Sequence, residues 1–344
     1  MMNPIIFSRK VFDYFYSHLI QRNKYWLWYY LCAIRSKKIK EKLLCVYKEK
    51  RSCPKEPFQG VVCLYEGNVY QGGLADRLRG ILSVYKTCKD RGIDFKLHFK
   101  HPFDLEWYLQ PNQYDWRMLE ENIECDTNKV ELLVLDATSD DAYSRKKQER
   151  WLYNHICMKT KQYHCYTNVC YSYDYDYSVL FSELFALTPR LEHSIEVLKQ
   201  SINQLYISVS ARFLDLLGDF NESFGYGMPL PDEQKERLIS ANLKQIEEFH
   251  RQYPHYKILV NSDSITFTER AQAFPYVFVN PGSITHIDNT RDKGYEAFEK
   301  TFLDFFMIAN AERIYLLKTG RMYKSGYPYA ASLIYGKPFK VINF

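Results

Sequence analysis

The stretch that decides the fold runs from Gly60 to Gly92 and reads GVVCLY (60–65), then GGLADRLRG (72–80) and ILSVY (81–85). The first segment is short, apolar and bounded by turn residues, which predicts a strand. In the last two segments apolar residues recur at intervals of three and four, which predicts a helix. The glycines between them allow backbone conformations that other residues rarely adopt. We therefore expect a strand, a glycine loop and a helix.

The glycine pair Gly72-Gly73 has no side chains, so a ligand could come close to the first turn of this helix. The free N–H groups and the positive end of the helix dipole favour an anion there. However, the loop matches neither G-x-x-x-x-G-K-[ST] nor G-x-G-x-x-G, so it is no strict nucleotide fingerprint. A tight turn whose glycines serve packing alone is the other interpretation.

The sequence of the loop, GGLADRLRG at 72–80, resembles that of bacterial fucosyltransferase-like glycosyltransferases. This family includes relatives of the α1,2-, nodulation-type α1,6- and protein O-fucosyltransferases. The resemblance implies the α/β fold called GT-B, in which two Rossmann-like domains face a cleft. It also implies that the loop closes over the donor, with Asp76 or Arg77 reaching the donor or the acceptor.

Composition is compatible with two ordinary domains. The chain has 344 residues, of which 46% are hydrophobic and 25% charged, and this length allows two sizeable cores. Thirty tyrosines suit sugar binding, because aromatic faces stack on sugars and hydroxyls hydrogen-bond, although an AT-rich coding sequence has the same effect. Nine cysteines without C-x-x-C or zinc spacing indicate a reduced, cytoplasmic protein with no structural metal.

The N-terminal segment, residues 1–55, is basic and is expected to be helical. Up to Arg51 it holds twelve Lys or Arg against three Asp or Glu, whereas the whole chain is only +5. The aromatic run at 24–35 is shorter than the roughly twenty residues that span a bilayer. Trp and Tyr beside cations favour a lipid headgroup boundary, so we expect a peripheral contact with an anionic membrane. A helix packed on the first domain, aromatic side inward, is the alternative.

Two Rossmann-like domains are expected after this segment, an acceptor domain at 56–200 and a donor domain at 201–344. Residues 180–205 have the 3.6-residue period of a long helix, interrupted at Thr188-Pro189, that would carry the chain between the domains. No nucleic-acid motif occurs in the sequence, and we expect no nucleic-acid partner.

The donor domain opens with the β-rich run 205–210, followed by Arg212 and a loop with three carboxylates. A guanidinium can neutralise a leaving diphosphate, and a carboxylate can take the proton of an acceptor hydroxyl. The family ends this strand in a His-x-Arg-Arg type signature, and SVSAR at 208–212 matches it in Arg212 but lacks the histidine. An ordinary acidic surface loop is the alternative for the carboxylates.

A second strand, at 257–262, ends in Ser262 and Asp263. Ligands of open α/β sheets bind beyond the carboxyl ends of the strands, so both residues are candidates for contact with the nucleotide base or ribose. A cap of the next helix is the other interpretation of Asp263.

The C-terminal region carries the strongest resemblance. In the family, a helix with an aspartate, a strand and a serine turn that opens a helix hold the guanine nucleotide and its phosphates. Asp304 matches the aspartate, Thr319 or Ser325 the serine, and Tyr327 the aromatic residue. The inserted residues 320–324 leave that choice open, and their cations meet either phosphate or solvent.

The sequence thus predicts an inverting glycosyltransferase that moves fucose from GDP-fucose to a hydroxyl of a bacterial surface glycan, such as a lipopolysaccharide O-antigen or a capsule. Another nucleotide-sugar donor, or a non-catalytic glycan-binding scaffold, is the alternative. No metal or cofactor is expected, because arginine and helix dipoles can replace a cation. The candidate catalytic residues are Asp76, Asp215, Asp219 and Glu222. The candidate donor-binding residues are Gly72, Gly73, Arg77, Arg212, Ser262, Asp263, Asp304, Lys318, Thr319, Ser325, Gly326 and Tyr327.

Overall fold

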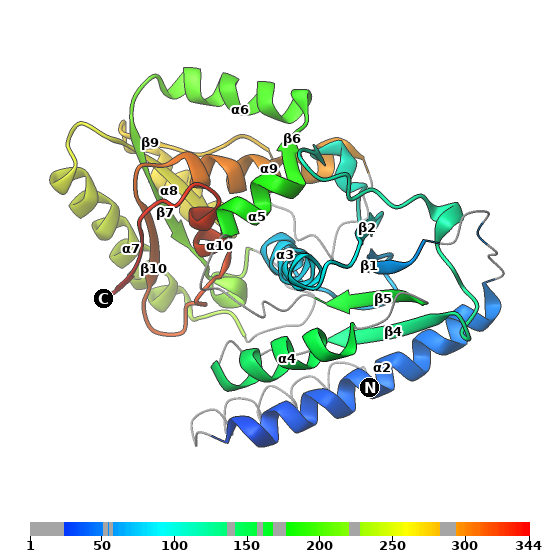
Figure 1. Ribbon diagram of the computed structural model, residues 1–344. Helices are drawn as coiled ribbons and strands as arrows, with labels where there is room; N and C mark the ends of the chain where they lie inside the picture. The colour runs from blue at the N-terminus through cyan, green and yellow to red at the C-terminus, as the bar shows by residue number, and fades with distance from the viewer. Residues whose placement is uncertain are drawn as a thin grey trace. The chain divides into compact units, whose positions relative to one another are not determined.

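The computed structural model describes residues 24–50, 54, 58–135, 142–156, 161–167, 177–219, 228–282 and 294–344. The chain divides into two compact units (Figure 1). The first comprises Met1–Asp104 and Pro111–Phe185, and the second comprises Leu105–Gln110 and Ala186–Phe344. Within the described residues, no helix is long and apolar enough to cross a membrane.

The first unit contains a parallel four-stranded sheet in the order β2-β1-β5-β4. Its strands are β1 (Gly60–Tyr65), β2 (Phe95–Phe99), β4 (Val130–Leu135) and β5 (Gln162–Thr167). Its helices are α2 (Tyr25–Glu49), α3 (Leu74–Arg91), α4 (Ala142–His155) and α5 (Tyr177–Leu184). All residues of β1 are buried, as expected for a strand covered on both faces.

The predicted strand, glycine loop and helix are confirmed by β1 and α3. Gly72 has a φ of 70°, which a glycine adopts without strain. Gly73 is the N-cap of α3 and offers no capping side chain. At the other end, Gly92 closes α3 in the left-handed conformation with φ 61°, a common helix stop.

The second unit contains a parallel five-stranded sheet in the order β11-β10-β7-β8-β9. The strands are β7 (Tyr206–Ala211), β8 (Lys257–Ser262), β9 (Val277–Phe278), β10 (Ile314–Lys318) and β11 (Phe339–Asn343). The helices are α6 (Pro189–Ile202), α7 (Asp232–Gln252), α8 (Ile265–Gln272), α9 (Tyr295–Asn310) and α10 (Tyr327–Ile334). Short 3-10 turns occupy Leu105–Trp107, Glu120–Asn122 and Leu214–Leu216.

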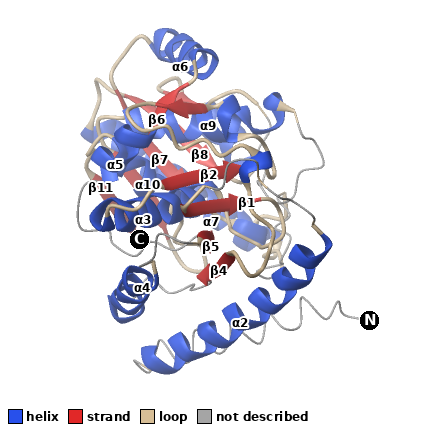
Figure 2. Cartoon of the chain, turned by 45° about the vertical axis from the view of Figure 1, so that its right-hand side comes forward, coloured by secondary structure: helices blue, strands red, loops and turns tan. Residues whose placement is uncertain are grey.

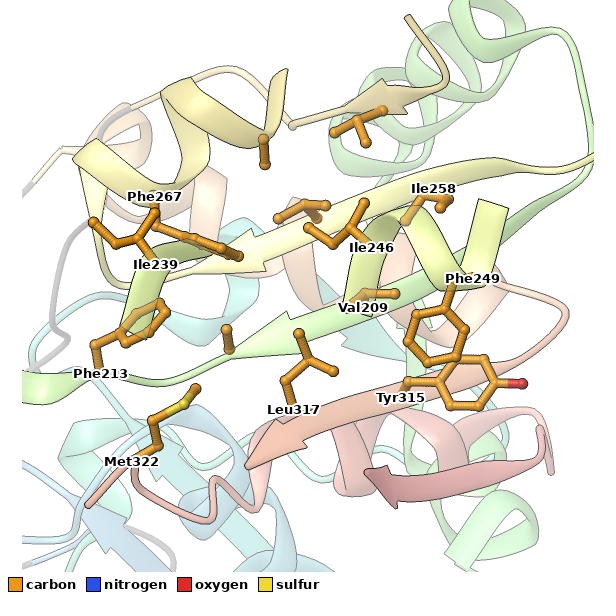
Figure 3. Close-up of a cluster of buried hydrophobic side chains, with 14 of the residues drawn as sticks. Val209, Phe213, Ile239, Ile246, Phe249, Ile258, Phe267, Tyr315, Leu317 and Met322 are labelled. Atoms are coloured by element: carbon orange, nitrogen blue, oxygen red, sulfur yellow. The ribbon is translucent and has the colours of Figure 1, made fainter. Parts of the chain in front are cut away.

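One face of this sheet is sealed by α7 and α8 (Figure 3). Ile246 and Phe249 of α7 and Phe267 of α8 pack with Val209 of β7 and Leu317 of β10 in one buried cluster. Separately, α9 packs on α6 and α10. The helices α7 and α8 therefore cover one face of β7 and β10.

The predicted long helix at 180–205 is wrong as one element. The chain forms α5, then the short strand β6 (Phe185–Leu187), and then α6. The predicted interruption is where α6 begins, because Pro189 lacks the N–H that a continuous helix would need and Thr188 before it is extended. β6 pairs with β3 (Leu109–Pro111) in a two-stranded sheet.

The longer segment of the second unit begins at Ala186, whereas the expected domain boundary lies at 200. The difference arises because α6 packs on α9, a helix of the second unit. Ser194 donates a hydrogen bond to Glu299 Oε1 at 3.0 Å, and the Arg190 guanidinium lies 3.6 Å from the centre of the Tyr295 ring. α2, within the expected separate N-terminal segment, belongs to the first unit.

Candidate functional site

The order of the strands in the second unit determines where a ligand would bind. From β7 the chain passes to β8 and β9 on one side, and β10 and β11 lie on the other. Open α/β sheets bind ligands at such a switch point, outside the carboxyl ends of the strands. Arg212 directly follows β7 and Thr319 directly follows β10, so both lie at this point. Tyr323 N donates to Arg212 O at 3.0 Å, which ties the segment after β10 to the arginine.

Arg212 is held by Asp263, which follows the neighbouring strand β8. Arg212 Nε lies 3.3 Å from Asp263 Oδ2, and the arginine side chain is 25% exposed while the Asp263 side chain is fully buried. The same carboxylate accepts the N–H groups of Phe213 at 2.8 Å and Leu214 at 2.7 Å. Burial raises the pKa of Asp263, and the Arg212 guanidinium opposes that effect. The carboxylate thus fixes the turn and positions the arginine.

This arrangement changes the interpretation of Ser262 and Asp263. The Asp263 side chain is fully buried and supports Arg212, and its contact with a nucleotide base or ribose stays a prediction. Ser262 Oγ accepts the N–H of Ser264 at 3.1 Å, which makes it part of the same turn. The alternative interpretation, in which Asp263 caps the next helix, is wrong. The N-cap of α8 is Ser264, whose Oγ accepts the N–H of Phe267 at 3.1 Å.

Two of the predicted catalytic carboxylates lie in the loop after β7. Asp219 Oδ2 accepts the hydroxyl of Ser264 at 2.7 Å and the N–H of Thr266 at 2.8 Å, so it stabilises the start of α8. Asp215 lies in the 3-10 turn Leu214–Leu216 and is partly buried. Glu222 lies outside the described residues.

The segment after β10 is held mainly by its own hydrogen bonds. Lys318 Nζ donates to Gly320 O at 2.7 Å, and the Thr319 hydroxyl donates to Phe344 O. Ser325 Oγ accepts the N–H of Tyr327 at 3.3 Å, beside Gly326, the N-cap of α10. Thr319 and Ser325 are the two candidates for the family's serine. Ser325 is the one that lies at a helix N-terminus, where phosphate binding is favoured.

Tyr327 anchors α10 on α9. Its hydroxyl donates to Thr301 O, and its ring meets the ring of Phe305 edge to face at 5.1 Å between centroids. Burial raises the pKa of Tyr327 well above the usual value. The side chain that sequence matched to the family's aromatic residue thus joins the two helices that flank β10.

Asp304 on α9 lies in a polar cluster with two residues that the sequence reasoning missed. Asp304 Oδ1 accepts Lys300 Nζ at 3.1 Å and Asn280 Nδ2 at 2.9 Å, and Lys300 Nζ also donates to Asn280 O at 2.8 Å. Burial raises the pKa of Asp304, and Lys300 opposes that effect. Asn280 is 3% exposed, and its Oδ1 has no hydrogen-bond partner among the residues that the structure describes. The i,i+4 spacing of Lys300 and Asp304 would have predicted part of this cluster.

In the first unit, Arg77 is a support for the glycine loop. It is 2% exposed, and it donates from Nε to Gly72 O at 2.8 Å and from Nη1 to His101 O at 2.7 Å. Its guanidinium lies 5.7 Å from the ring centre of Tyr65 and 5.4 Å from that of Phe99. Because these neighbours enclose the cation, its position favours holding the loop over binding a donor.

Asp76, one residue before Arg77, lies in the first turn of α3 and forms an ion pair with Arg79. The side chain of Asp76 is 41% exposed. A carboxylate in the first turn stabilises a helix, which accounts for its position. Among the residues that the structure describes, no group of three His, Cys, Asp or Glu side chains could hold a metal ion.

Comparison with known proteins identifies the fold. No protein-family model matches the sequence, and no curated protein matches it. Among solved structures, the chain is similar to the NodZ α-1,6-fucosyltransferase co-crystallised with GDP, with a TM-score of 0.53 and 12% identity over 83% of this chain and 95% of that one. Another structure of NodZ, from Bradyrhizobium, gives a TM-score of 0.52 and 13% identity over 83% and 96% of the two chains.

A plant enzyme gives the same result. A variant of FUT1 from Arabidopsis thaliana in complex with GDP has a TM-score of 0.50 and 8% identity, over 90% of this chain and 78% of that one. The chain has the GT-B fold of fucosyltransferases. The predicted fold class is thereby confirmed, and the resemblance predicted from the glycine loop and the C-terminal region is confirmed for the fold.

Proposed function

We propose that this protein is a glycosyltransferase that moves fucose from GDP-fucose to a hydroxyl group of a glycan. The observation that carries the proposal is Arg212 at the switch point of the second sheet, held by the buried Asp263 and tied to the segment that leads into α10. A guanidinium at this place can bind a diphosphate and stabilise its charge as it leaves. The fold is one that serves GDP-fucose in the similar enzymes.

The diphosphate would be shared between Arg212 and the start of α10. At the N-terminus of α10 the N-cap Gly326 has no side chain, and Ser325 Oγ accepts the N–H of Tyr327 at 3.3 Å. The Ser325 hydroxyl, placed at the positive end of this helix, suits a phosphate oxygen. Arginine and backbone donors can neutralise the leaving diphosphate without a metal. We therefore propose a metal-independent reaction.

Asp304 would recognise the guanine base. The N1–H and the exocyclic amino group of guanine are adjacent donors, and a carboxylate accepts both. Lys300 and Asn280 hold Oδ1 of Asp304, which fixes the orientation of the carboxylate. Burial raises the pKa of Asp304 and the Lys300 ammonium opposes that effect, so Lys300 favours the ionised, accepting form of the carboxylate.

We propose an inverting single displacement. The acceptor hydroxyl attacks the anomeric carbon from the side opposite the diphosphate, the bond from that carbon to the diphosphate breaks, and a carboxylate takes the hydroxyl proton. Asp219 supports the start of α8 and Asp76 is paired with Arg79. Replacement of each of the four candidates, Asp215 and Glu222 as well as Asp76 and Asp219, tests which one is the base.

The acceptor we propose is a growing bacterial surface glycan, a lipopolysaccharide O-antigen or a capsule, assembled in the cytoplasm. The proposal follows from the resemblance to bacterial fucosyltransferases and from the thirty tyrosines of the chain, which suit sugar binding. No nucleic-acid partner is proposed.

The test is thermal stabilisation of the purified protein by GDP, UDP, CMP and dTDP in the presence of EDTA. A ligand at one hundred times its dissociation constant stabilises the native state by about 2.7 kcal/mol. We expect GDP alone to raise the melting temperature, and GDP-fucose but not GDP-mannose to be hydrolysed slowly. Arg212→Ala should abolish the GDP response, whereas Arg237→Ala, on the exposed face of α7, should not.

Other outcomes distinguish the alternatives. Stabilisation by UDP or CMP alone would mean that the protein is a glycosyltransferase with a different sugar donor. This second candidate function is favoured by the absence of the family's histidine before Arg212. No response to any nucleotide would favour a non-catalytic glycan-binding scaffold. That scaffold would also tolerate replacement of Asp215 and Glu222, whereas an enzyme would lose turnover with at least one of them.

A further inference from the structure

Helix α2 has one face packed on the first unit and one face open to solvent. Cys32, Leu43 and Tyr47 are buried, and the helix lies along β4 (Figure 2). On the other side, Trp26 and Tyr30 are each 61% exposed and Ile34 is 39% exposed. The alternative that the aromatic side of this helix packs inward is therefore wrong for Trp26 and Tyr30.

The orientation of α2 is fixed by its C-terminal half. The Tyr47 hydroxyl hydrogen-bonds to His164 Nδ1 and, at 2.8 Å, to the hydroxyl of Tyr166, both on β5. Leu43 and Tyr47 belong to the same buried cluster as Val62 and Leu132 of the sheet. Because the helix is anchored in this way, the side chains on its opposite face point away from the sheet.

The exposed apolar residues form one strip with basic residues beside it. Trp26, Tyr30 and Ile34 are four residues apart, which places them in a row on a helix. Lys37 and Lys38 lie three and four residues beyond Ile34 and are exposed. We call these five residues the outer face of α2.

The helix as a whole carries a net positive charge. Residues 25–49 hold six cations, Arg35, Lys37, Lys38, Lys40, Lys42 and Lys48, against two carboxylates, Glu41 and Glu49. A second copy of this helix would bring the same excess of positive charge to the interface and would be repelled. Residues 1–23 carry three cations against one carboxylate, so they too offer no complementary charge. An anionic partner complements this surface.

We propose that the outer face of α2 binds an anionic lipid surface. Tryptophan and tyrosine settle at the level of lipid headgroups, with the ring in the apolar part and the polar atom in the wet part. Lysines beside them are attracted to anionic headgroups, each with a substantial contribution close to the surface. The contact is peripheral, since the strip is short and lies along the helix. This inference does not depend on the identity of the sugar donor.

The experiment is co-sedimentation of the full chain with vesicles of phosphatidylcholine, with and without 30% phosphatidylglycerol. We expect binding to the anionic vesicles that weakens as salt is raised. The double variant Trp26→Ala with Tyr30→Ala and the double variant Lys37→Glu with Lys38→Glu should each bind about tenfold more weakly or worse. The matched control is Trp107→Ala with Tyr335→Ala, two other exposed aromatic residues, which should bind as the wild type does.

Several results would overturn the proposal. These are no binding to the anionic vesicles, equal binding by the two α2 variants and the wild type, or equal binding to neutral and anionic vesicles. A melting temperature several degrees lower for Trp26→Ala with Tyr30→Ala would mean that the chain itself covers this face. Loss of a dimer in that variant, measured by light scattering, would assign the face to a second copy.

Discussion

The Nε of Arg212 lies 3.3 Å from Oδ2 of Asp263, at the ends of two neighbouring strands of the second sheet. The same carboxylate accepts the two backbone N–H groups that follow the arginine. One buried side chain therefore sets both the path of the turn and the place of the cation. The guanidinium that we propose as the diphosphate ligand is thus positioned by the protein's own groups.

Asp263→Asn tests this support. The amide keeps the shape but removes the charge that balances Arg212 and places an N–H₂ group against backbone donors. We expect a loss of about 2 to 4 kcal/mol in the free energy of unfolding and at least tenfold weaker GDP binding, measured by urea denaturation and calorimetry. Asp232→Asn, at a side chain that is 97% exposed, is the control. Unchanged GDP binding in a folded Asp263→Asn protein would remove Arg212 from the diphosphate site.

Lys300→Met tests the recognition of guanine. The variant leaves the buried Asp304 without the cation that opposes its raised pKa, so the carboxyl takes up a proton more readily and loses acceptor strength. We expect the preference for GDP over IDP, which lacks the amino group, to fall about tenfold, or about 1.4 kcal/mol. Competition binding with both nucleotides measures it, and Lys199→Met on the exposed side of α6 is the control. An unchanged preference would place the base elsewhere.

His164 makes the stability of the first unit depend on pH. Burial lowers the pKa of His164 from 6.5 to about 3, so between these values the unfolded chain binds a proton that the folded chain does not. Stability should be constant above pH 6.5 and fall below it by as much as about 1.4 kcal/mol per pH unit. Urea denaturation at pH 7, 6 and 5 measures the slope.

The matched variant for this prediction is His164→Gln, which cannot titrate. It should be less stable than the wild type at pH 7, because the hydrogen bonds of His164 to Tyr47 and to Gln162 Oε1, 2.5 Å away, are altered, but its stability should change less between pH 7 and 5. His155→Gln, at an exposed histidine, should keep the wild-type slope. Equal slopes in all three proteins would contradict the assignment.

Arg77→Lys tests the support of the glycine loop. A lysine has one ammonium group and cannot reproduce the fork that reaches both Gly72 O and His101 O. We expect a loss of about 1 to 3 kcal/mol in the free energy of unfolding and faster amide exchange in the loop before α3. Arg117→Lys, where the side chain is 51% exposed, should change neither quantity.

Much of the fold was predictable because local periodicity follows from neighbours in the chain. The β-rich run at 60–65 and the three- and four-residue spacing after it predicted β1 and α3, and the β-rich runs at 205–210 and 257–262 predicted β7 and β8. The long helix at 180–205 was not predicted correctly, since a helical period says nothing of a three-residue strand that pairs with Leu109–Pro111.

The sequence predicted where several residues of the candidate site lie, but not which residues support them. The sequence placed Arg212 after a strand, Asp304 within a helix and Ser325 just before a helix, and the structure keeps them there. The sequence did not assign the supporting role of Asp263, and it missed Lys300 and Asn280. Asp263 is fifty residues from Phe213, whose N–H it accepts, and no local pattern encodes such a pair.

The sequence by itself determined the strands β1, β7 and β8, the glycine loop and the charge of the N-terminal helix, because each depends on residue type and short-range spacing. Its resemblance to a known family implied the two α/β domains. Only the tertiary structure decided which charged groups are supports and which face outward. Arg77 and Asp263 are enclosed by segments distant in the chain, while Trp26 and Tyr30 are left open by the way Tyr47 docks their helix. Burial depends on what packs around a side chain, and distant parts of the chain decide that.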